Sequence, residues 1–114
     1  NAEEMKQRTK AFAINVGRLT ELLPNTDIKD RKGQIIRSSS SVGANYRAVR
    51  RAKSKPDFIN KLKIVEEELD ESLFFLELLV EFNARFKKEI DELYTEGETL
   101  LKIIVATLVS ARKQ

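Results

Sequence analysis

Residues 37–79, RSSSSVGANYRAVRRAKSKPDFINKLKIVEEELDESLFFLELL, decide the fold of this chain. The stretch starts rich in serine, becomes basic, is broken by Pro56, and then turns acidic and finally apolar. Residues 29–55 carry nine Lys or Arg and one acid, a net charge of +8, whereas residues 66–81 carry seven acids and no Lys or Arg. The two segments flanking Pro56 are therefore oppositely charged and can fold against each other.

Apolar residues spaced three and four apart predict helices over residues 2–23, 28–52, 56–85 and 86–112. Pro24 should end the first helix, and Asp27 can cap the second. Ser54 and Asp57 resemble a capping box at the start of the third helix. The boundary between the last two helices has the weakest sequence signal, because residues 83–88 contain neither Gly nor Pro.

Each predicted helix carries one apolar stripe. The stripes are Met5, Phe12, Val16, Leu19 and Leu23; Ile35, Ser39, Val42, Tyr46 and Val49; Phe58, Leu62, Val65, Leu69, Leu73, Leu76 and Val80; and Ile90, Leu93, Gly97, Leu100, Ile104 and Leu108. They predict an all-α, antiparallel up-down four-helix bundle in a single domain over residues 1–114. The small residues Ser38 to Ser41 should form a close-packing surface.

The composition excludes several classes of function. The chain of 114 residues has no Cys and no His, which removes disulfides, thiolate metal sites and the commonest general base near neutral pH. No secretory signal is evident, and the apolar windows are too short and too charged to span a membrane. We expect a cytoplasmic protein without a cofactor, a membrane partner, catalytic residues or metal ligands.

Two windows carry more apolar side chains than one stripe requires. Eight of ten residues are apolar in both residues 73–82 and residues 100–109. A second face of the third helix should therefore be buried against another subunit, because large exposed apolar patches are a liability. The candidate interface residues are Phe74, Phe75, Leu78 and Phe82, and they predict a homo-oligomer.

The basic stretch is the main candidate for a functional site. The candidate residues for binding RNA or DNA are Arg37, Arg47, Arg50, Arg51, Lys53 and Lys55. Such a cluster attracts phosphate backbones, and with Tyr46 as the only ring nearby, binding should depend on the backbone rather than on the bases. The alternative is that Arg47 and Arg50 pair with the acids of residues 66–71, within or between subunits.

Two polar features have structural interpretations. Asn45, beside Tyr46, falls on a largely buried face, where the partners of its amide would fix helix register. The carboxylates of residues 66–71 could hold a metal ion, but the neighbouring arginines favour an ion-pair network instead.

The same stretch resembles the signature of the 23S rRNA intervening-sequence proteins. The matching elements are Arg37-Ser38-Ser39, residues 42–47, residues 50–54, Asp57-Phe58, Lys61-Leu62, Glu67, residues 70–73 and residues 76–79, with residues 8–12 and Leu23-Pro24 near the N-terminus. The resemblance implies a four-helix bundle that assembles into a ring-like homopentamer. A related branch, the accessory variability protein of diversity-generating retroelements, works with nucleic acid and a reverse transcriptase.

Three hypotheses for the function follow. The first is a non-enzymatic oligomer that binds RNA or DNA electrostatically through the basic end of the second helix. The alternative is a scaffold that docks a protein partner, with the charges serving subunit assembly. A carboxylate metalloenzyme is the third, and metal content of the purified protein would test it.

Overall fold

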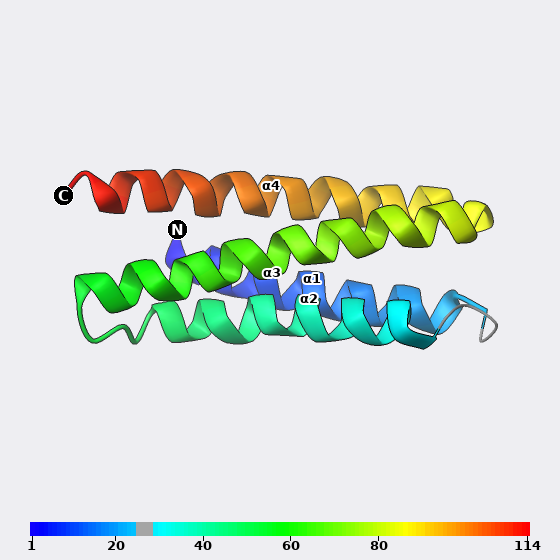
Figure 1. The fold of residues 1–114 in the computed structure, drawn as a ribbon, viewed down its shortest axis with the longest axis horizontal. Coiled ribbons are helices and arrows are strands. Elements are labelled where there is room, and N and C mark those ends of the chain that lie inside the picture. Colours follow the sequence, from blue (N-terminus) through cyan, green and yellow to red (C-terminus); the bar gives the residue numbers. More distant parts are fainter. Residues whose placement is uncertain (25–28) are drawn as a thin grey trace.

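The computed structural model describes residues 1–24 and 29–114, and within them four long helices follow one another without a strand. These are α1 (Ala2–Leu22), α2 (Lys29–Val49), α3 (Lys55–Phe82) and α4 (Lys87–Arg112), with the 3-10 turn η1 (Ala84–Phe86) before α4. Consecutive helices run antiparallel along a rod of 47 × 20 × 19 Å (Figure 1). The predicted all-α, antiparallel four-helix bundle is confirmed.

Each helix packs against two neighbours in a closed order. α2 contacts α1 and α3, and α4 contacts α3 and α1, while the described residues show no diagonal contact. The α1–α4 side is joined by Arg8, which donates from Nη2 to Glu96 Oε1 at 2.7 Å and from Nε to Oε2 at 3.1 Å. This hydrogen-bonded pair raises the pKa of Arg8. The surface between α1 and α2 thus lies opposite the surface between α3 and α4.

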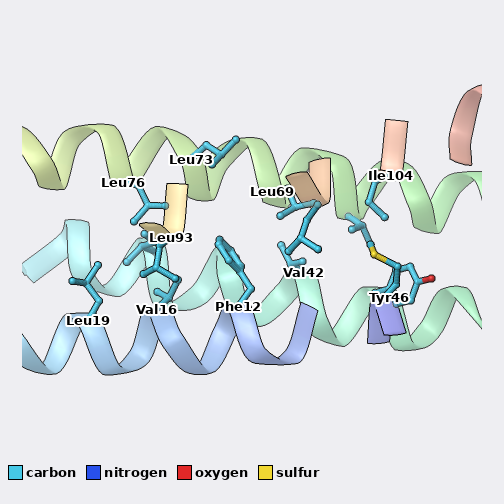
Figure 2. Close-up of a cluster of buried hydrophobic side chains, with 14 of the residues drawn as sticks. Phe12, Val16, Leu19, Val42, Tyr46, Leu69, Leu73, Leu76, Leu93 and Ile104 are labelled. Atoms are coloured by element: carbon cyan, nitrogen blue, oxygen red, sulfur yellow. The ribbon is translucent and has the colours of Figure 1, made fainter. Parts of the chain in front are cut away.

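The four predicted stripes meet on the bundle axis. All stripe residues of α1, α2 and α4 are buried, together with the Leu23 that follows α1. Figure 2 shows core side chains from all four helices, among them Phe12, Val42, Leu73 and Ile104. In α3 the stripe differs at its ends, because Phe58 and Val80 are only partly buried and Leu79 occupies the core.

Small residues let the helices approach closely at two places. Ser38 of α2 and Ser72 of α3 are both buried, and their Oγ atoms are 2.8 Å apart in a hydrogen bond between the helices. Ser39 is buried as well, whereas Ser40 is exposed, so the predicted packing surface covers only part of the serine run. At Gly97, an added Cβ would lie 2.8 Å from Leu73 Cδ2, so a side chain there would require Leu73 to shift.

Two helix starts are capped by side chains. Asn1 Oδ1 accepts from the amide of Glu4 at 2.9 Å, and Ser54 Oγ accepts from the amide of Asp57 at 3.2 Å. The predicted cap at Ser54 is confirmed. The carboxylate of Asp57 accepts hydrogen bonds from the amide of Lys53, at 3.0 Å, and from Lys61 Nζ. These bonds, that of Lys61 first, lower the pKa of Asp57.

Two helix ends differ from the prediction. α2 ends at Val49 rather than at residue 52, because the amides of Arg51 and Ala52 bond to carbonyls three residues back and tighten the chain into turns. α3 ends at Phe82 rather than at residue 85, where Asn83 leaves helical geometry with φ −140° and ψ 53°.

The buried side chain of Asn83 supplies a reason for this break. Its Nδ2 donates to the carbonyl of Leu79 at 3.0 Å, a local bond of the kind by which Asn competes with the helical backbone. The predicted cap at Asp27 and the predicted start of the second helix at Ile28 lie outside the described residues.

Apolar side chains remain exposed on the outer surface of α3 and α4. Phe74 is 52% exposed and Phe82 is 63% exposed, and Val105 and Val109 of α4 are exposed as well. Phe75 and Leu78 are instead partly buried, so the four candidate interface residues divide into two exposed and two inner side chains. Among the described residues, no helix is long and apolar enough to cross a membrane.

Candidate nucleic-acid interface

A groove of about 270 Å³ lined by four cations lies where the start of α1 meets the end of α2. Lys6 contributes from the second turn of α1, Arg47 from the last turn of α2, and Arg50 and Arg51 from the turn that follows. The antiparallel arrangement of α1 and α2 brings these two segments together (Figure 1). We call these four residues and the space between them the basic groove.

One ion pair stands at the groove. Arg50 Nη1 donates to Glu3 Oε2 at 2.6 Å, and this hydrogen bond is the first cause that lowers the pKa of the Glu3 carboxyl. The pair joins the turn after α2 to the first turn of α1. It orients one guanidinium and neutralises one of the four positive charges.

The other three cations differ from Arg50, although the charge of Lys6 also acts on Glu3 and helps to lower the pKa of its carboxyl. Within the described part of the chain, Lys6, Arg47 and Arg51 form no side-chain hydrogen bond or ion pair, and both arginines are exposed. Four cations beside one carboxylate leave an excess of positive charge, which creates a field that attracts polyanions. The groove is therefore suited to phosphate groups, which Arg can bind in a bidentate manner.

The remaining predicted cations lie elsewhere. Arg37 is held against α3, where its Nη1 donates to Glu68 at 3.1 Å and its Nη2 donates to Glu71. Lys55 donates to the carbonyl of Gln114 at the chain end, and Lys53 lies in the turn before α3. The structure thus brings Arg47, Arg50 and Arg51 into one groove, and it does not bring Arg37 there.

The predicted pairing of Arg47 and Arg50 with the acids of residues 66–71 is wrong within the subunit. Arg50 pairs with Glu3 of α1, and the acids Glu68 and Glu71 are taken by Arg37. The cause is rotational position: Arg37 lies on the side of α2 that faces α3, whereas the basic groove lies on the side that faces α1. Pairing between subunits stays a prediction.

Lys6 is the groove residue that sequence reasoning missed. Its position could have been predicted from the topology, because an antiparallel helical hairpin places the start of the first helix beside the end of the second. The prediction considered only cations close together in the sequence, and Lys6 is more than forty positions before Arg50.

Asn45 and Tyr46 lie next to the groove in the sequence but face other surroundings. Tyr46 is buried in the core, and burial raises the pKa of its hydroxyl. Asn45 is half-buried rather than largely buried, and its Nδ2 donates to the carbonyl of Ser41 at 2.9 Å and to Ser41 Oγ at 2.8 Å. These partners belong to its own helix.

The opposite side of the bundle has the opposite charge. Glu66, Glu67 and Asp70 of α3 line a shallow groove of about 240 Å³ with Leu101 and Val105 of α4. We call this the acidic groove. Among the residues that the structure describes, no group of three or more carboxylates converges in a way that could hold a metal ion.

The fold places the chain in the class of antiparallel four-helix bundles. The family model of the 23S rRNA-intervening sequence protein matches residues 2–106, and the chain belongs to this family. No curated protein matches the chain.

A solved structure supports the same assignment. It is a crystal structure of a protein of unknown function from the S23 ribosomal protein family of Bacteroides thetaiotaomicron VPI-5482. The two chains are 30% identical and superpose with a TM-score of 0.84, over 91% of this chain and 97% of the other. The superposition therefore covers nearly the whole bundle.

Proposed function

We propose that this protein is a non-enzymatic, homo-oligomeric bundle that binds RNA or DNA through the basic groove. The observation that carries the proposal is that Arg47 and Arg51 share a groove with Lys6 and have no acidic partner among the described residues. Phosphate would supply the missing counter-charge. Because one groove offers few contacts, binding by a single subunit should be weak and independent of sequence.

Assembly would strengthen such binding. The exposed rings of Phe74 and Phe82 on α3 support burial against another subunit, and the resemblance to the family implies five subunits in a ring. A ring repeats the basic groove, so a polynucleotide that reaches several grooves gains affinity from effective concentration alone.

Salt dependence tests the proposal. Fluorescence anisotropy with short labelled RNA and DNA, from about 50 to 200 mM salt, should give an affinity that falls steeply, since each phosphate contact releases counterions. Replacing Arg47, Arg50 and Arg51 together by Glu should abolish binding. Failure to bind at the lowest salt, or binding unaffected by the charge reversal, would reject the basic groove as the site.

The acidic groove favours a second candidate, a scaffold that docks a protein partner. Leu101 and Val105 of α4 line this groove together with acids of α3, and Phe74 is exposed on α3. A basic, amphipathic segment of a partner would fit this surface. Its binding would depend on the apolar residues and would survive charge reversal in the basic groove, which separates the two candidates.

A further inference from the structure

Beside the basic groove, at the end of the bundle, lies a shallow hollow of about 450 Å³. Its lining includes the apolar Val49, Phe58 and Ala111 and the cations Arg50, Lys53 and Lys55, of which Lys55 donates to the carbonyl of Gln114. The helices α2, α3 and α4 all end or begin here (Figure 1). The hollow therefore combines an aromatic ring with positive charge.

Arg50 belongs to both spaces, because it lines the basic groove and also the hollow. Phe58 in turn lines a second shallow hollow of about 460 Å³, which continues over Ile103 and Ala111 along α3 and α4. Arg50 therefore links the basic groove to a hollow that is lined by the half-buried Phe58.

This order of groups corresponds to the two halves of a nucleotide. Phosphates require the cations, and the flat face of a base packs well on an aromatic ring. In a duplex the base faces are stacked on one another and cannot reach Phe58. In a single strand they are free to turn away from the backbone and lie on it.

We infer that the basic groove takes single-stranded RNA or DNA in preference to duplex, with phosphates at Arg47, Arg50 and Arg51 and a base on Phe58. The inference rests on the proposed function and names its substrate class. It also replaces the expectation that no ring lies near the arginines apart from Tyr46, because folding brings Phe58 of α3 to the end of α2.

The test compares three labelled probes of equal length: a single strand, a duplex and an abasic strand that keeps the phosphates but lacks the bases. Phe58→Leu removes the ring and keeps an apolar side chain. It should weaken binding of the single strand about fivefold or more and leave duplex and abasic strand within twofold of wild type. Phe86→Leu is the matched control, since Phe86 is also half-buried but lies at the other end of the bundle.

A second variant reports contact directly. The chain has no Trp, so Phe58→Trp introduces a single fluorophore at the hollow. Its fluorescence should be quenched in a saturable way by the single strand and not by the abasic strand. Both variants are compared with wild type by circular dichroism, and Phe58→Trp keeps the test valid if Phe58→Leu does not fold.

The outcomes separate this inference from the proposed function. If wild type binds none of the probes at low salt, both fail. If it binds single strand and duplex equally, and Phe58→Leu affects neither or both alike, the basic groove remains a phosphate site and the role of Phe58 is overturned.

Discussion

Arg50 donates to Glu3 across a distance of 2.6 Å, and this pair is the point where the turn after α2 is joined to the first turn of α1. It is also the one acid–base contact formed by the basic groove in the described part of the chain. Glu3 therefore competes with any phosphate that approaches Arg50. The side chains of Arg50 and Glu3 are 40% and 58% exposed, so this competition should be modest and sensitive to salt.

Glu3→Gln should raise the affinity for nucleic acid. Removing the carboxylate frees Arg50 for phosphate, and an exposed ion pair of this kind corresponds to an effect of about two- to fivefold at low salt. Anisotropy at about 50 mM salt would measure it. Glu21→Gln changes the charge equally at the far end of α1 and should leave the affinity unchanged. Equal effects of the two variants would show that only net charge matters.

Two glycines should respond oppositely to alanine. An added Cβ at Gly43 meets Thr9 O at 3.5 Å, an ordinary contact, so Gly43→Ala should raise the free energy of unfolding by about 0.5–1 kcal/mol through helix propensity. At Gly97 the added Cβ lies 2.8 Å from Leu73 Cδ2 and 3.3 Å from Phe12 Cε1, and Gly97→Ala should instead lower it by about 1 kcal/mol through overpacking.

Urea denaturation of the two glycine variants would measure this difference. The double variant Gly97→Ala with Leu73→Val should recover part of the loss, because a shorter side chain makes room for the new methyl group. Stabilisation by Gly97→Ala alone would mean that Leu73 and Phe12 move aside without cost, and the close packing described for α3 and α4 would be wrong.

Phe74→Ser should reduce the mass of the particle in solution and leave its helical content unchanged. Phe74 is half exposed in one subunit, so the subunit itself loses little on substitution, whereas an interface would lose a buried ring. Light scattering coupled to gel filtration measures the mass. Ile14→Ser is the control, since Ile14 is similarly exposed on α1. An unchanged mass for Phe74→Ser would place the interface on another surface.

Much of the fold could be predicted from apolar spacing. The stripes of α1, α2 and α4 coincide with the buried residues because a period of 3.6 leaves one face of each helix for the core. Helix ends were less predictable: the end of α3 depends on the buried amide of Asn83, and no Gly or Pro marks it. The tight turns at Arg51 and Ala52 likewise depend on backbone bonds that composition does not reveal.

The candidate site was predictable in part. The three arginines of the basic groove are close in sequence, so their proximity follows from one helical turn and the turn after it. Which acids these arginines pair with depends on how each helix is rotated about its axis. The sequence does not show this rotation, so the acids predicted for Arg50 were the wrong ones. Lys6 and Phe58 reach the site only through the packing of α1 and α3 against the end of α2.

The central claim is that Arg47 and Arg51 bind phosphate, and the salt dependence of affinity tests it most directly. For a single strand, the slope of log affinity against log salt should become shallower by about 1.4 for each occupied groove when both arginines are replaced by Gln, since each lost phosphate contact removes about 0.7. Lys88→Gln with Lys102→Gln removes two exposed cations of α4, which does not contact α2 in the described structure, and should leave the slope unchanged. An identical slope for wild type and the arginine variant would contradict the account.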